Sequence, residues 1–280
     1  SRGLGDVYKR QTFMWPKSFW YKVYEPIIRK AAGFGAASIK HDKEKYEHKY
    51  EYCDLLITGS GPSGLASAYA AAQNGAKVIL AEDKSRFGGS LLTSEVTIGN
   101  QSGQEWAEKI ISELKSMPNV IVKNRSQVFG YYDHNMLVMS ERISDHLPKT
   151  EKYSPKQRLW YIRAKEVIIS SGSIERPLVF GNNDTPGVML SSAAKEYLKI
   201  YGVLVGKKPL VFTNNDSGYE TAIEFKKNGI DPIILDTRKD PNSEIIQEAK
   251  DLNINIKTSY VVVAAKGYKK VNSADIAKLS

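Results

Sequence analysis

Cysteine and long apolar runs are nearly absent from this sequence of 280 residues. Its single cysteine, Cys53, excludes an internal disulfide and a metal site built from several cysteines. No apolar run approaches the roughly 18 residues that a membrane-spanning helix needs, and no signal peptide is visible. We therefore expect no membrane partner and a reducing, cytoplasmic setting. The histidines have neither metal-ligand spacing nor a pattern with paired acids, so we expect no metal and no catalytic histidine; they are His41, His48, His134 and His146.

Acidic residues are scarce in the first 50 residues, which carry 11 basic and 5 acidic side chains of a chain whose net charge is +9. The same stretch is rich in aromatic residues from Trp15 to Tyr24. A basic aromatic arm could contact nucleic acid or an anionic membrane, or pack across a neighbouring domain or subunit. We favour packing, and expect no nucleic-acid partner. Residues 1–11 resemble a translated adapter, so the fold prediction excludes them.

Residues 54–83 form a strand–turn–helix–strand unit of the dinucleotide-binding type. The apolar runs 55–58 and 77–81 predict two buried parallel strands, with an alanine-rich helix between them. Glu82 ends the second strand, where a ribose-binding acid belongs.

The turn of this unit contains three glycines at the spacing that a pyrophosphate requires. Gly59 permits the tight turn, Gly61 lets the backbone approach the phosphates, and Gly64 lets the helix pack closely on the strand. The unit predicts dinucleotide binding. The alternative is a degenerate unit whose glycines only pack.

The first domain is predicted to span residues 51–175 after the arm of residues 1–50. Its later segments are a helix, a short strand, a β-meander, and a strand that runs into a Ser-Gly-Ser turn around Gly172. This order is the plan of the two-dinucleotide-binding flavoprotein fold, an α/β architecture. The segments are 104–117, 120–122, 127–132, 136–142, 158–163 and 166–171.

A second Rossmann-like domain is predicted over residues 176–280. A helix at 191–201 precedes a βαβ unit that ends at Asp236. Its turn lacks the first two glycines, and Asp216 would repel a pyrophosphate. We therefore expect a degenerate unit that is a poor dinucleotide site. The sequence ends without the strand that closes the first sheet in such folds, so we expect a truncated fold, part of a longer polypeptide.

Longer motifs occur in the order that is typical of one family, from about residue 14 to about residue 265. Together they resemble the alpha subunit of heterotetrameric sarcosine oxidase. The motifs are Trp20 to Gly33, the Gly-Ser-Gly-Pro-Ser-Gly turn, and the segments beginning at Phe129, Arg158, Ile174, Asn183 and Phe212.

The resemblance implies that the bound dinucleotide is NAD and that this chain contains no catalytic residue. It also implies a flavin-bearing beta subunit and further small subunits, with FAD and FMN on or beside the beta subunit. Sarcosine would be oxidised there, with hydrogen peroxide as a product. The methyl carbon would leave as methylene-tetrahydrofolate or formaldehyde, with tetrahydrofolate bound in a C-terminal domain outside this sequence.

The resemblance and the fold plan together place a set of residues around the cofactor. Gly59, Gly61, Ser63 and Gly64 would contact the pyrophosphate, and Glu82, Asp83 and Lys84 would surround the adenosine ribose. Ser90 and Val128 would line the cofactor, and Gly172 would let the chain pass beneath it.

Two other functions fit the same residues. The first is an FAD-binding subunit of an amine or opine dehydrogenase, because the first glycine motif of such folds commonly holds FAD. The second is a non-catalytic scaffold module.

Overall fold

The computed structural model describes residues 15–33, 39–148 and 154–279, so the predicted adapter at residues 1–11 lies outside the described residues. The chain divides into two compact units, Ser1–Glu44 and Lys45–Ser280. The first contains a π-helical turn, η1 (Trp20–Tyr24), followed by helix α2 (Glu25–Ala31). The aromatic residues of this arm are largely exposed within it, with Trp15 at 86% and Tyr21 at 80%.

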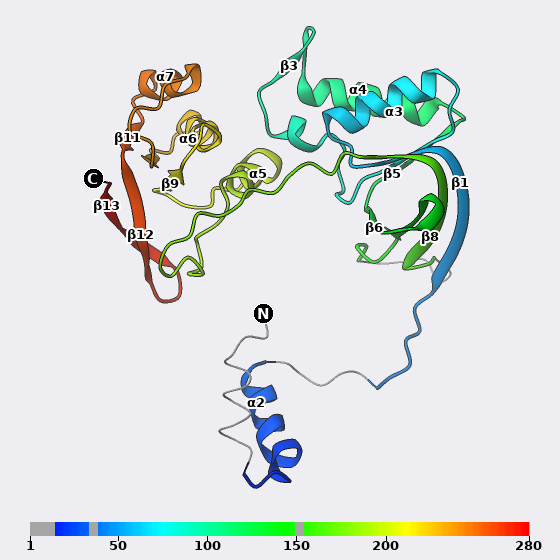
Figure 1. Cartoon of the computed structure of the whole chain (residues 1–280), viewed down its shortest axis with the longest axis horizontal. Helices are drawn as coiled ribbons and strands as arrows, with labels where there is room; N and C mark the ends of the chain where they lie inside the picture. The colour runs from blue at the N-terminus through cyan, green and yellow to red at the C-terminus, as the bar shows by residue number, and fades with distance from the viewer. Residues whose placement is uncertain (1–14, 34–38, 149–153, 280) are drawn as a thin grey trace. The chain divides into compact units, whose positions relative to one another are not determined.

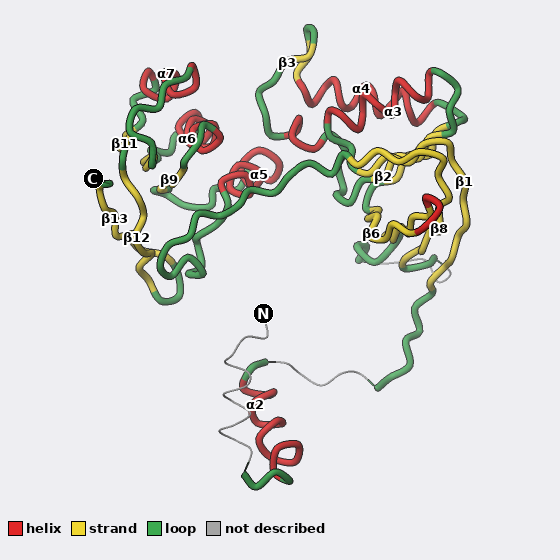
Figure 2. The backbone as a smooth tube through the Cα atoms, viewed as in Figure 1, coloured by secondary structure: helices red, strands yellow, loops and turns green. Residues whose placement is uncertain are grey.

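A six-stranded sheet organises the first half of the larger unit, in the order β5-β2-β1-β8-β7-β6 (Figures 1 and 2). The first four strands are parallel to one another, and β7 and β6 continue the sheet in antiparallel fashion. Helices α3 (Pro62–Gln73) and α4 (Gly103–Ser116) pack together on one face. The strands are β1 (Tyr46–Thr58), β2 (Val78–Ala81), β5 (Val120–Lys123), β6 (Ser126–Tyr132), β7 (Met136–Arg142) and β8 (Gln157–Ile169).

Strands β1 and β8 are longer than the sequence predicts. They pair in parallel from Tyr46 opposite Gln157 to Thr58 opposite Ile169. The predicted strands 158–163 and 166–171 are therefore one continuous strand. Alternation of buried and exposed side chains continues through the buried Ala164, and no turn residue interrupts the run. As a result, one strand belongs to both the parallel sheet and the meander.

The two faces of this sheet bury different cores. On one face, apolar side chains of β1 and β2 pack against α3 and α4 around Leu65 and Leu114. On the other, Cys53 and Met139 pack with Trp160. Burial raises the pKa of the Cys53 thiol to about 12, so this cysteine is a packed side chain and not a nucleophile.

Short elements complete the first half. Helix α4 begins with a capping box, in which the Ser102 hydroxyl accepts the amide of Glu105 and the Glu105 carboxylate accepts the amide of Ser102. The other elements are η2 (Gly89–Leu92), β3 (Thr97–Ile98), β4 (Gln101–Ser102) and η3 (Asp133–Asn135), the last forming the turn between the paired strands β6 and β7.

The second half repeats a smaller Rossmann-like layout, as predicted. Three parallel strands, in the order β11-β10-β9, are accompanied by helices, and a hairpin of β12 and β13 follows. The elements are α5 (Ser191–Tyr201), β9 (Leu210–Thr213), α6 (Ser217–Lys227), β10 (Ile233–Asp236), α7 (Glu244–Asp251), β11 (Asn255–Thr258), β12 (Tyr260–Gly267) and β13 (Val271–Lys278).

Candidate dinucleotide-binding site

The buried Ser60 joins three segments of the chain at the carboxyl edge of the first sheet. Its hydroxyl donates to Oε2 of Glu82 over 2.5 Å, and its amide donates to the same oxygen over 2.9 Å. The amide of Gly88 in turn donates to the Ser60 carbonyl at 3.0 Å and to its hydroxyl at 3.2 Å. The glycine turn, the acid after β2 and the Gly88–Gly89 pair therefore meet at one residue.

The three motif glycines differ in what a side chain would meet. A Cβ on Gly59, whose φ is +95°, would collide with the carbonyl of Ser170. One on Gly64 would collide with the carbonyl of Gly59, so α3 lies directly against the turn. A Cβ on Gly61 would meet nothing within 4 Å. Gly59 and Gly64 are thus required by packing, whereas Gly61 faces space that a ligand can use.

The N-terminus of α3 fits an anion. Gly61 is the N-cap residue, Pro62 occupies the first turn, and no described side chain caps this helix end. The amides of Ser63 and Gly64 lie among the first N–H groups of the helix, which have no partner within it. Such amides and the positive end of the helix dipole favour a phosphate group.

Glu82 is buried, with 6% of its surface exposed. Burial raises its pKa, but hydrogen bonds from Asp83, Ser60 and the amide of Lys84 outweigh this effect and hold the pKa below its ordinary value. The carboxylate is therefore ionised at neutral pH. The hydrogen bond with Glu82 raises the pKa of Asp83, with burial as the next cause. The side chains of Glu82 and Asp83 are thus hydrogen-bonded to each other at the edge of the turn.

The remaining predicted site residues are less closely joined. Lys84 is turned to helix α5, where its ammonium group lies 2.8 Å from Oε1 of Glu196. Ser90 is exposed in η2, directly after the Gly88–Gly89 pair. Val128 is partly buried against the core on the opposite face of the sheet from α3. Gly172 has a φ of +70° and no close neighbour for a Cβ, in the segment after β8.

Two residues of this site escaped the sequence analysis, Ser60 and Glu196. The signal for Ser60 was its place between two motif glycines, a position where a buried polar side chain must find a partner. Nothing in the sequence indicated Glu196 as a site residue, because it lies in another domain and approaches Lys84 only in the folded chain.

In the second domain, charged side chains of the protein lie at the turn that corresponds to the glycine turn of the first domain. Asp236, at the end of β10, is fully buried and accepts hydrogen bonds from Tyr219 and Arg238 at 2.8 Å each. Arg238 also lies 2.8 Å from Asp216, the N-cap residue of α6. Burial raises the pKa of Asp236, but its bonds with Arg238 outweigh that and lower it. The weak dinucleotide binding predicted for this domain fits the geometry and stays a prediction.

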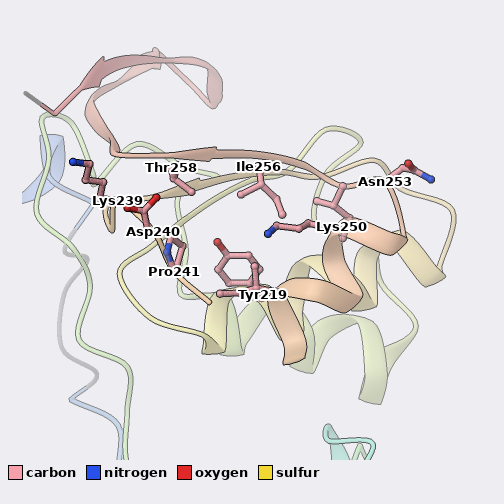
Figure 3. A pocket seen from close by; sticks show the side chains of 10 residues that line it. Tyr219, Lys239, Asp240, Pro241, Lys250, Asn253, Ile256 and Thr258 are labelled. Atoms are coloured by element: carbon pink, nitrogen blue, oxygen red, sulfur yellow. The ribbon is translucent and has the colours of Figure 1, made fainter. Parts of the chain in front are cut away.

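A cavity of about 570 Å³ lies beside this charge cluster and is lined entirely by second-domain residues (Figure 3). Lys250 and Ile256 point into it above the ring of Tyr219, whereas Lys239 and Asn253 point away. The cavity is thus separate from the residues around Ser60.

None of the helices within residues 15–33, 39–148 and 154–279 combines the length and hydropathy of a membrane span. Within the same ranges, no three histidine, cysteine or acidic side chains gather in a way that could hold a metal ion.

Comparisons with known proteins agree with this geometry. The family model described as FAD dependent oxidoreductase matches residues 54–137, which include the whole glycine-turn unit. In fold, the chain is similar to thioredoxin reductase of Lactococcus lactis, with a TM-score of 0.59 and 21% identity over 81% of this chain and 71% of that one. The predicted α/β fold class is confirmed.

Two curated relatives are similar in sequence. Sarcosine oxidase subunit alpha of Rhizobium meliloti is 42% identical over 98% of this chain, and that of a Corynebacterium species (strain P-1) is 35% identical over 82%. The chain spans about a quarter of the length of these relatives, 27% and 24%. Over that span, this chain is homologous to the sarcosine oxidase alpha subunits.

Proposed function

We propose that this chain is the dinucleotide-binding region of a sarcosine oxidase alpha subunit and that its dinucleotide is NAD. The observation that carries the dinucleotide-binding part of the proposal is the open backbone at Gly61, near an uncapped helix N-terminus and the ionised Glu82. Homology to the alpha subunits over nearly the whole chain supports it.

Each part of the site has a separate task in this proposal. The amides of Ser63 and Gly64 would bind the pyrophosphate, which could approach because Gly61 has no side chain. Glu82 would accept a hydrogen bond from the adenosine ribose, with Asp83 and Lys84 beside it. Ser90, Val128 and Gly172 would line the remaining length of the cofactor. Bound NAD supplies a nicotinamide ring that can exchange a hydride.

The oxidation itself is assigned to another subunit of a heterotetramer. A flavin-bearing beta subunit, with FAD and FMN on or beside it, would oxidise sarcosine to glycine and pass electrons to oxygen to give hydrogen peroxide. The methyl carbon would leave as formaldehyde or as methylene-tetrahydrofolate. The described residues of this chain would bind the dinucleotide and form part of the subunit interface, in the cytoplasm.

FAD is the second candidate for the same site. The match of residues 54–137 to a family described as FAD dependent oxidoreductase favours it, and an amine or opine dehydrogenase subunit would then be the function. The pyrophosphate and ribose contacts would be the same for both dinucleotides, so the adenosine half of the site does not separate them.

The cofactor released from the full-length protein separates the candidates. After denaturation and filtration, a flavin absorbs visible light, whereas NAD absorbs only in the ultraviolet and becomes reducible by an added alcohol dehydrogenase. We expect NAD in a ratio near one per alpha subunit. FAD at that ratio in the separated alpha subunit would replace the proposal with the second candidate, and absence of any dinucleotide would leave the scaffold function.

A further inference from the structure

Ser60 is hydrogen-bonded to two other segments of the chain, through Glu82 and Gly88. It is completely buried, and its hydroxyl donates to Glu82 while accepting the amide of Gly88. Its own amide donates to the same carboxylate oxygen of Glu82. A buried hydroxyl with both its donor and its acceptor used is part of a fixed network.

We propose that Ser60 is the positioning residue of the dinucleotide site, holding Glu82 so that a single carboxylate oxygen, Oε1, faces the ribose. This inference rests on the proposed function, because it concerns how that same site recognises its ligand. Ser60 does not contact the ligand in this arrangement and acts through Glu82.

The hydrogen bonds of Glu82 decide which oxygen is free. Each carboxylate oxygen accepts about two hydrogen bonds. Oε2 already accepts two, from the amide and the hydroxyl of Ser60. Oε1 accepts the amide of Lys84 at 3.0 Å, and the side chain of Asp83 is hydrogen-bonded to the same carboxylate. Oε2 is thus used by the glycine turn, and a ribose hydroxyl would bind at Oε1, beside Asp83.

The carboxylate of Glu82 is shared between the ligand and the glycine turn, so that ribose recognition and the shape of the pyrophosphate loop are coupled. The Gly88–Gly89 pair is held by the same serine, and a Cβ on Gly89 would lie only 2.9 Å from the Cα of Gly61. Ser60 thereby holds in place the glycine turn and the Gly88–Gly89 pair, the two segments that border the space at Gly61.

A double-mutant cycle on the full-length protein tests the inference. Affinities for NAD and NADP are measured by calorimetry for the wild type, Ser60→Ala, Glu82→Gln and the double variant. We expect Ser60→Ala to weaken NAD binding about tenfold, as loss of a hydrogen bond to a charged group does. NADP binding should weaken less, so the ratio of the two affinities should fall. In the double variant the affinity should match Glu82→Gln within about twofold, because the serine acts through the glutamate.

The control is Ser67→Ala, which removes a serine hydroxyl from helix α3, directly after the turn and outside the Ser60 network. It should leave both affinities unchanged. Additive effects of Ser60→Ala and Glu82→Gln, or an unchanged NAD-to-NADP ratio in Ser60→Ala, would overturn the positioning role while wild-type NAD binding still supports the proposed function. Wild-type protein that binds neither NAD nor FAD would overturn the proposed function, and this inference with it.

Discussion

The ammonium group of Lys84 lies 2.8 and 2.9 Å from the two carboxylate oxygens of Glu196, and so joins the residue after Glu82 and Asp83 to helix α5 of the second domain. The hydrogen bond with Glu196 also raises the pKa of Lys84. A lysine next to a ribose site would attract a 2′-phosphate if its charge were free. Here that charge is compensated from another domain, which at the proposed site would favour NAD over NADP.

Breaking this ion pair should relax selectivity against NADP. In Glu196→Gln we expect NADP affinity to rise by up to about fivefold, the range of a partly exposed ion pair, with NAD affinity unchanged. The matched control is Glu220→Gln, which breaks the 2.7 Å pair with Lys195 of the same helix. Calorimetry with both nucleotides checks the result. Equal NADP affinity in the two variants would show that Glu196 does not restrain Lys84.

Gly61→Val should abolish cofactor binding and leave the fold intact. The backbone at Gly61 has φ −66° and ψ −177°, which valine adopts easily, and a Cβ there meets no neighbour within 4 Å. The branched side chain would instead fill the open space that we propose for the pyrophosphate. The cofactor content of the purified full-length variant tests the loss of binding, and its urea unfolding curve tests whether the fold is intact. Normal cofactor content would disprove the pyrophosphate role of this turn.

Gly64→Ala, in contrast, should lower the stability of the fold. Its Cβ would collide with the carbonyl of Gly59, which would push α3 away from β1. We expect a loss of about 1–3 kcal/mol in the free energy of unfolding, as for other overpacked sites. Chemical denaturation measures it, with Gly61→Val as the comparison. An unfolding free energy equal to that of the wild type would mean that close helix packing does not require Gly64.

The glycine turn could be predicted from the sequence because each of its parts is local. Gly59, Gly61 and Gly64 lie in one short segment, and the apolar runs around them have no competing interpretation. The extent of β1 could not be predicted in the same way. Its first half, from Tyr46 to Tyr52, is mostly exposed and polar, and it becomes a strand only because β8 pairs with it. The same partner makes β8 continuous where two strands were predicted.

The hydrogen-bond network around Ser60 could not be predicted from the sequence, for a different reason. Ser60 and Glu82 meet only because β1 and β2 are parallel with Thr58 opposite Ala81, and the sequence does not give that register. In the second domain Asp216 was identified as unfavourable for a phosphate, but its ion pair with Arg238 depends on two loops that the fold brings together.

At neutral pH the wild-type protein should be less stable than the variant Asp83→Asn. The pKa of Asp83 is raised, first by its hydrogen bond with Glu82, so the folded state holds its proton more tightly than the unfolded state. A raised pKa contributes stability below the ordinary aspartate pKa of 3.8, which is lost as the pH rises through the folded value. Asp83→Asn should therefore raise the melting temperature at pH 7 and lose this advantage near pH 3. Melting curves between pH 3 and pH 7 test this prediction. A rise in melting temperature that is the same at every pH would show that the hydrogen bond with Glu82 does not cause it.

Removal of the Arg238 guanidinium should destabilise the second domain and leave dinucleotide binding unchanged. In Arg238→Met, Asp236 would stay fully buried with Tyr219 as a partner but without its cation. One lost partner of a buried pair typically costs 3–5 kcal/mol, and we expect about 2–3 kcal/mol here because a third of the Arg238 side chain is exposed.

The pH dependence identifies the cause of that loss. In the wild type the pKa of Asp236 is lowered, so its contribution to stability is present above the ordinary pKa of 3.8 and disappears as the pH falls through the folded value. Without the arginine this pKa should rise, and the difference in unfolding free energy between variant and wild type should shrink as the pH falls toward 4. The double variant Arg238→Met with Asp236→Asn should recover much of the lost stability, because it leaves no uncompensated charge. A loss that is the same at every pH and is not recovered would mean that Arg238 acts by packing alone. A parallel loss of NAD affinity would instead place the dinucleotide against the second-domain turn.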